Sequence, residues 1–383
     1  MLICNGLIYW PDKTFRPGTL SVHGEKITAI SSSEIQHQES DEEIIDASGK
    51  YVVPGLIDIH AHGFVGCDFS DGDAASIKTI SRYLSLHGIT SFAASIMSMP
   101  VAHMAACCAI IAGFCQNGSE GAYCHGLHLE GPFLSPAKCG AQASENLISP
   151  SNHTFDQLRL AGNGFLRMLT VAPELSDAID FIQHASAYCT VALGHTQTDY
   201  ASAVKAIRAG AKHITHLYHA MPPLHHRAPG LIGAAIDTEV TIELICDGYH
   251  VHPAAIRAAY RLFGAERTVL ISDSMSACGM PDGRYSLGGQ EVQVHARKAT
   301  LRNGTLAGTA CDLMDDLRNA VDCGIRLEDA LQSATINPAK VIGCDHQTGS
   351  LEVGKNADIV LLDQKLSVRD VWIKGVHMEQ CRP

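Results

Sequence analysis

The feature that most constrains the fold is a series of eight apolar runs, most of which end in polar or ionisable residues. After residue 54 these runs cover residues 55–62, 89–97, 123–132, 165–174, 189–196, 213–221, 240–248 and 268–275. Their length and their turn-like boundaries predict strands. Helical patterns at 73–88, 198–210 and 252–264 lie between some of the runs, and each ends at a glycine that suits a helix C-cap.

Strands that alternate with helices favour a parallel sheet. Eight strand–helix units match a (β/α)8 TIM-type barrel, in which the carboxyl ends of the strands converge on one site. An open, doubly wound sheet is the competing architecture, but no G-x-G-x-x-G phosphate loop follows the first run. We therefore predict an α/β protein with a catalytic barrel over residues 54–344.

The two ends of the chain have a different pattern from the middle. Short apolar runs at 2–10, 18–30 and 43–53 predict strands, as do the runs at 348–363 and 368–376. We expect residues 1–53 and 345–383 to form one small β-sandwich domain built from both termini. The polar segment 31–43 interrupts these strands and is expected to be a mobile loop.

Composition limits the possible partners and the cellular location. The 383 residues carry a formal net charge of −12, which argues against non-specific binding to nucleic acid. Neither a signal-peptide pattern nor a long apolar span is present, so we expect a soluble cytoplasmic protein without a membrane partner. The fourteen cysteines include no C-x-x-C pair and are expected to be free thiols.

Imidazole and carboxylate groups gather at the ends of the predicted strands. The candidates are His60, His62, Glu130, His195, His216 and Asp273. In a barrel these side chains would meet in space, and together they suit zinc, iron, cobalt or manganese.

Some of the histidines admit a plainer interpretation. His60 and His62 would share one face of a strand, but in a chain with 21 histidines such a pair also arises by chance. His128 and His213 are interpreted as ordinary core histidines or as supports for the metal ligands. A lone Glu130 facing imidazoles would need a partner, because burial of an unpaired carboxylate is costly.

Six motifs in order carry a resemblance to a known family. They lie at residues 54–63, 126–136, 193–196, 215–235, 245–253 and 271–289. Together they resemble the N-acetylglucosamine-6-phosphate deacetylases of the amidohydrolase superfamily, and the similarity covers almost the whole chain. The resemblance implies a metal-dependent barrel with a small β-domain, and hydrolysis of an acetamide on a phosphorylated amino sugar.

The resemblance also assigns roles to residues. Glu130, His195 and His216 match the principal metal ligands of the family, and Asp273 matches its catalytic aspartate, which we also count as a ligand. His60 and His62 match the pair found in members with a second metal. The cofactor implied is a divalent metal, zinc or iron, with one or two ions per chain.

Substrate contacts follow from weaker matches to the family pattern. Arg227 and His250 match residues that bind the phosphate, with Arg227 reaching across from the neighbouring subunit of a homodimer, and Ala220 matches a backbone contact. Two positions depart from the pattern: His219 replaces a common asparagine, and Gln142 replaces a common histidine. Both can still donate hydrogen bonds to a sugar phosphate or an acetyl group.

Three alternatives remain open at this point. The substrate could be the galactosamine epimer, because the orientation of one hydroxyl is not legible in a sequence. A cyclic-amide hydrolase would place a metal-bridging lysine on the fourth strand, and the run at 165–174 contains none. A catalytically silent binding barrel would be expected to lose metal ligands, and none is lost.

Overall fold

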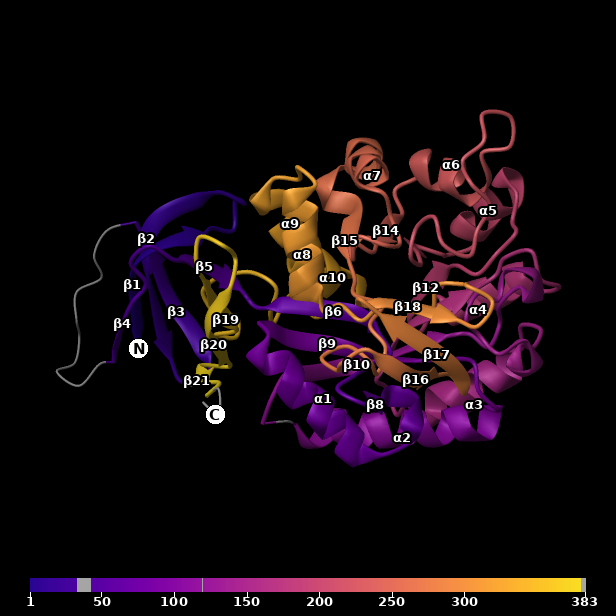
Figure 1. Cartoon of the computed structure of the whole chain (residues 1–383), viewed down its shortest axis with the longest axis horizontal. Helices are drawn as coiled ribbons and strands as arrows, with labels where there is room; N and C mark the ends of the chain where they lie inside the picture. Colours follow the sequence, from indigo (N-terminus) through magenta and orange to yellow (C-terminus); the bar gives the residue numbers. More distant parts are fainter. Residues whose placement is uncertain (33–42, 119, 380–383) are drawn as a thin grey trace.

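The computed structural model describes residues 1–32, 43–118 and 120–379, and its larger part is the predicted parallel barrel. Eight parallel strands pair in the order β15-β14-β13-β12-β11-β10-β9-β6 (Figure 1). They are β6 (Leu56–Ala61), β9 (Ile89–Ile96), β10 (Tyr123–Glu130), β11 (Leu166–Val171), β12 (Thr190–Leu193), β13 (His213–Ile214), β14 (Thr241–Leu244) and β15 (Thr268–Leu270). Each of the eight predicted strands is therefore confirmed.

Burial on both faces explains why these strands have nearly continuous apolar sequences. Small and branched side chains such as Ile57, Ala93 and Val269 fill the inside of the barrel. The chain just after β15 closes the circle, since the Asp273 backbone N–H donates to the His60 carbonyl at 2.9 Å. This closure brings the ends of the first and last strands together.

Helices cover the outside of the barrel and are positioned by local capping signals. The Asp73 side chain accepts a hydrogen bond from the Ala75 N–H at the start of the first helix, and Gly88 follows its end with φ of 80°. The helices are α1 (Ala74–Leu86), α2 (Val101–Asn117), α3 (Asn152–Ala161), α4 (Ala178–Ala185), α5 (Tyr200–Arg208), α6 (Gly230–Ile236), α7 (Pro253–Arg267), α8 (Leu313–Asp322), α9 (Leu327–Ala334) and α10 (Ile336–Val341).

Both ends of the chain contribute to one eight-stranded sheet beside the barrel, as predicted (Figure 1). Its strands are β1 (Leu2–Tyr9), β2 (Phe15–His23), β3 (Lys26–Ser31), β4 (Ile44–Asp46), β5 (Tyr51–Pro54), β19 (Ile359–Leu362), β20 (Val368–Ile373) and β21 (Val376–His377). The N-terminal and C-terminal parts join where β5 pairs antiparallel with β19. A separate buried cluster that includes Ile8, Leu20 and Trp372 packs within this unit. The expected mobile loop at 31–43 falls almost entirely outside the described residues.

A three-stranded antiparallel sheet after the last barrel strand was not predicted from the sequence. It consists of β16 (Gly283–Leu287), β17 (Gln290–His295) and β18 (Lys298–Leu301). The Gly288–Gly289 pair and the alternation of polar and apolar residues in β17 are hairpin signals in the sequence that could have revealed it. Cysteines in the described residues are free thiols, as expected. No helix in the described part of the chain is long and apolar enough to cross a membrane.

Candidate active site

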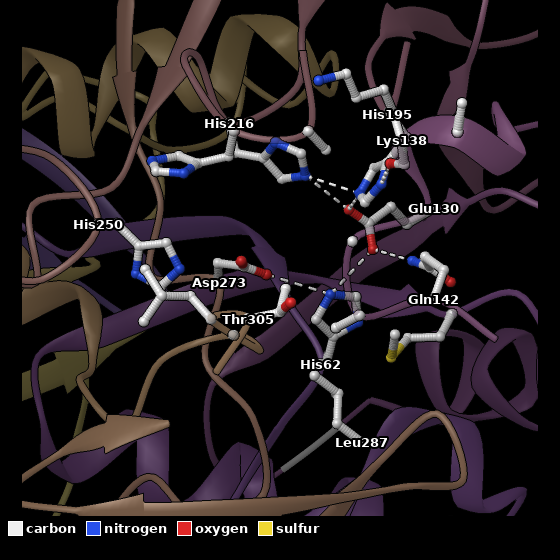
Figure 2. Close-up of a pocket in the computed structure, with 18 residues that line it drawn as sticks. His62, Glu130, Lys138, Gln142, His195, His216, His250, Asp273, Leu287 and Thr305 are labelled. Carbon is white, nitrogen blue, oxygen red and sulfur yellow. Dashed lines mark hydrogen bonds and ion pairs between the residues drawn. The ribbon is translucent and has the colours of Figure 1, made fainter. Parts of the chain in front are cut away.

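The six predicted strand-end residues form two adjacent groups at the carboxyl end of the barrel. Glu130, His195 and His216 make one group, in which one ligand atom from each residue lies within 4.8 Å of the others. His60, His62 and Asp273 make the other group with the same spacing. All six are buried, and they come from the ends of β6, β10, β12, β13 and β15. The barrel therefore assembles residues that are far apart in sequence (Figure 2).

In the first group, two imidazole nitrogens and one carboxylate oxygen face one another. The His195 Nδ1–H donates to the Lys138 carbonyl at 2.9 Å, so its Nε2 carries a lone pair in the neutral ring. That Nε2 lies 3.1 Å from Glu130 Oε1 and 3.1 Å from His216 Nε2. The His216 Nε2 lies 3.0 Å from the same Glu130 oxygen. Three electron-rich atoms converge on one point (Figure 2).

The second group repeats this pattern. The His62 Nδ1–H donates to the Ser95 carbonyl at 3.3 Å, and its Nε2 lies 3.3 Å from both Glu130 Oε2 and Asp273 Oδ1. The His60 Nε2 has no hydrogen-bond partner among the described residues. It points toward Glu130 Oε1 at 3.4 Å and Asp273 Oδ1 at 3.6 Å.

The two carboxylates in these contacts stabilise a positive charge in the site. Although burial opposes it, Asp273 and Glu130 raise the pKa of His62 to about 10. A divalent cation can supply this charge in place of a proton, and neutral imidazoles with carboxylates in this arrangement are the donor set of a borderline metal such as zinc or iron. The residues therefore fit a metal centre. Glu130 lies between the two groups: its Oε1 is near His195, His216 and His60, and its Oε2 is near His62.

The backbone at the ends of these strands is unusual. His195, His216 and Asp273 have positive φ values of 50°, 24° and 47°, in the left-handed region that non-glycine residues rarely adopt. Such strain persists only where the surrounding structure enforces it, and it clusters at functional sites. The left-handed turn directs each side chain inward at the point where its strand ends.

Gln142 is held firmly against the metal-ligand candidates. Its Nε2 donates to Glu130 Oε2 at 2.5 Å, and its Oε1 accepts a hydrogen bond from the Ser98 N–H at 2.8 Å. Both ends of the amide are therefore already bonded, and the side chain is buried. Gln142 thus bonds directly to Glu130, and its predicted contact with the substrate stays a prediction.

A cavity of about 390 Å³ opens directly over the two groups. Four predicted substrate residues line it, namely Gln142, His219, Ala220 and His250. The His250 Nδ1–H donates to Asp247 Oδ2 at 2.7 Å, which leaves its Nε2 available to the cavity. Burial, reinforced by His250 and His216, lowers the pKa of His219 to about 3, so this ring is neutral at pH 7.

Arg227 lies elsewhere in its own chain. It sits in the exposed segment between β13 and α6, where its Nη1 lies 2.7 Å from His226 Nε2. It is not among the described residues that line the cavity. Lys138 is the one lysine or arginine among the described residues that line the cavity, and the sequence analysis did not select it.

The two histidines interpreted as supports are both fully buried, and neither belongs to a metal-ligand group. His128 lies against Ser95 and Thr170, and His213 lies against Glu243. The sequence analysis overlooked Glu243, although a single carboxylate in the apolar run at 240–248 is a signal that it needs partners.

The fold and this site define a class of protein. A family model described as "Amidohydrolase family" matches residues 51–378, and the chain belongs to this family. The chain is 38% identical to the N-acetylglucosamine-6-phosphate deacetylase of Vibrio furnissii, over 85% of this chain and 82% of that protein. It is 36% identical to the N-acetylgalactosamine-6-phosphate deacetylase of Escherichia coli O157:H7, over 91% of each.

A solved structure is similar over nearly its full length. It is a mutant N-acetyl-D-glucosamine-6-phosphate deacetylase from Mycobacterium smegmatis in complex with N-acetyl-D-glucosamine-6-phosphate. The TM-score is 0.93, with 32% sequence identity and 99% of each chain covered. The barrel and the terminal sheet therefore follow the fold of these deacetylases.

Proposed function

We propose that the chain is a metal-dependent hydrolase that removes the acetyl group from N-acetylglucosamine 6-phosphate. The products are glucosamine 6-phosphate and acetate, as in the catabolism of amino sugars. The observation that carries the proposal is the pair of buried histidine–carboxylate groups under one cavity, in a chain similar to deacetylases over most of its length. The silent-barrel alternative loses ground because both groups are complete.

Glu130, His195 and His216 would hold the principal ion, and His60, His62 and Asp273 would hold a second one. We propose zinc or iron, because imidazole nitrogens and carboxylate oxygens suit both. When bound, such an ion lowers the pKa of water toward neutrality and acts as a Lewis acid toward a carbonyl oxygen.

Asp273 is the proposed proton carrier. Burial alone would raise its pKa, but His62 and His60 lower it below the usual range, so the group is a carboxylate at neutral pH. Its side chain is 12% exposed and lines the cavity, within reach of a bound substrate. Asp273 can take a proton from the attacking water and then deliver it to the leaving amine.

The cavity explains how a phosphorylated sugar could be held. Its volume of about 390 Å³ is in the range of small-molecule sites. We propose that His219, His250 and the backbone of Ala220 contact the sugar phosphate. His250 is oriented for this by Asp247, and neutral His219 can donate one hydrogen bond.

Arg227 is proposed to act in a homodimer, in the cavity of the neighbouring chain. The support is its exposed position away from its own cavity. Mixing Arg227→Ala chains with Asp273→Asn chains should then restore a fraction of active sites, because some hybrid dimers pair both intact residues. Verified hybrids without any recovery would place Arg227 in the site of its own chain.

We further propose a cytoplasmic location for this enzyme.

The deciding experiment is an acetate-release assay on phosphorylated and unphosphorylated N-acetyl amino sugars, with metal content measured on the same preparation. Metal-loaded protein should release acetate from N-acetylglucosamine 6-phosphate, and a chelator should abolish the reaction. Full activity in protein shown to be metal-free would refute the mechanism.

The galactosamine epimer is the second candidate substrate. It is favoured by the 36% identity to a protein named N-acetylgalactosamine-6-phosphate deacetylase. Comparing kcat/KM for the two 6-phosphates in the same assay decides between them. A higher value for the galactosamine compound would reassign the substrate without changing the chemistry.

A further inference from the structure

Glu243 is a buried carboxylate that links three segments behind the metal-ligand groups. It lies in β14, is completely inaccessible to solvent and is not among the described residues that line the cavity. Its Oε2 accepts hydrogen bonds from the His60 Nδ1–H at 2.9 Å and from the His216 backbone N–H at 2.9 Å. Its Oε1 accepts one from the His213 Nε2–H at 3.1 Å.

These bonds determine which nitrogen of His60 can bind an ion. An ionised carboxylate only accepts hydrogen bonds, so the His60 proton must be on Nδ1. In the neutral ring Nε2 then carries a lone pair, and it points toward Glu130 and Asp273. That atom has no hydrogen-bond partner among the residues the structure describes. The orientation and the tautomer of His60 therefore both depend on Glu243.

His213, which donates to Glu243, is itself held by a second hydrogen bond. The His213 Nδ1 lies 2.6 Å from the Thr241 hydroxyl oxygen. In the neutral ring the nitrogen that does not donate to Glu243 is an acceptor, so the Thr241 hydroxyl, which also lies 3.3 Å from the Lys212 carbonyl, can donate to Nδ1. Thr241, which is half-buried, and the buried His213, Glu243 and His60 thus form a continuous chain of hydrogen bonds that ends at the metal-ligand groups.

We infer that Glu243 is a positioning residue that orients His60 as a metal ligand and so controls how tightly the His60, His62 and Asp273 group holds its ion. The inference rests on the metal-dependent function proposed above. Carboxylates that orient a ligating histidine in this way are known to contribute about 10- to 100-fold to metal affinity. Glu243 reaches His216 only through its backbone, so the first group should depend on it less.

Two variants separate positioning from general stability. Glu243→Gln retains an oxygen that can accept from both His60 and His216, and its amide can donate to His213 if that ring takes its other tautomer. Glu243→Ala leaves all three donors without a partner. Asp316→Asn is the matched control, because Asp316 is an equally buried carboxylate that accepts from the Cys246 N–H and belongs to neither metal-ligand group.

The measurement is zinc content per chain across a series of buffered free-zinc concentrations, with the melting temperature recorded for each variant. For Glu243→Ala we expect the equivalent that is lost in the His60→Asn variant to bind about 10- to 100-fold more weakly. Glu243→Gln should recover part of this affinity. Asp316→Asn should leave both equivalents unchanged.

Unchanged zinc affinity in Glu243→Ala would overturn the inference, as would equal weakening of both equivalents. A wild-type chain that takes only one equivalent would overturn it as well. Failure of the proposed function is a separate result, in which wild-type protein binds both ions but releases no acetate from any N-acetyl amino sugar.

Discussion

Replacing Asp273 with asparagine tests the proposed proton carrier most directly. The substitution preserves the shape of the side chain but removes its ability to accept a proton at neutral pH. Glu130 is the other carboxylate at the cavity, and it cannot substitute, because His195, His216, His62 and Gln142 already surround its oxygens. No further acidic side chain lines the cavity among the described residues.

The expected loss in kcat is large because no other carboxylate at the cavity can replace Asp273. General acid–base catalysis contributes about 10² to 10⁴ in rate, so kcat should fall by a factor in that range. The loss corresponds to about 2.7 to 5.4 kcal/mol in the activation free energy. KM should change little, because the rest of the cavity, including His219 and His250, remains in place.

The assay is steady-state acetate release from N-acetylglucosamine 6-phosphate at saturating zinc. Metal content must be measured on the same sample, since Asp273 also faces His62 Nε2 at 3.3 Å and belongs to the second ligand group. A variant that keeps its metal and loses activity identifies the proton carrier. If kcat stays within a few-fold of wild type, the assignment is wrong.

Three other substitutions test separate parts of the site. Replacing both His60 and His62 with asparagine should lower metal content by about one equivalent per chain while the fold, checked by circular dichroism, is retained. Arg227→Ala should lower kcat/KM about 10- to 100-fold for the phosphorylated sugar only, through loss of ~1.5 to 3 kcal/mol from a charged hydrogen bond; equal losses on the unphosphorylated sugar would indicate a structural role. Gln142→Ala should weaken zinc binding at Glu130 about tenfold, as measured by competition with a chelator, and an unchanged affinity would contradict its role as a support.

The barrel could be predicted because its signal is local. Each strand is buried on both faces, so it appears in the sequence as an apolar run, and the polar residue that ends it marks the catalytic edge. The ends of β6 and β10 show this, since His60 and Glu130 lie at the ends of runs in which most side chains are apolar. The division of the chain at residues 53 and 345 stays a prediction.

The features of the site that could not be predicted from the sequence depend on contacts between distant strands. His60 is 183 positions from Glu243 in the sequence, and nothing near Glu243 indicates that the two side chains lie 2.9 Å apart. The same holds for Gln142, which bonds Glu130 through its amide nitrogen, a geometry that only the folded backbone defines. The left-handed φ values of His195 and Asp273 could not be predicted either, because most histidines and aspartates have negative φ.

The two departures from the family pattern acquire different physical meanings in the structure. Gln142 also lines the cavity, but both of its amide atoms are bonded to protein, so its effect should be exerted mainly through Glu130 and the metal. His219 lines the cavity, and its Nε2 has no hydrogen-bond partner among the described residues, so its effect should be exerted on the substrate. A change at position 142 should therefore alter metal affinity, whereas a change at position 219 should alter KM and the choice between sugar epimers.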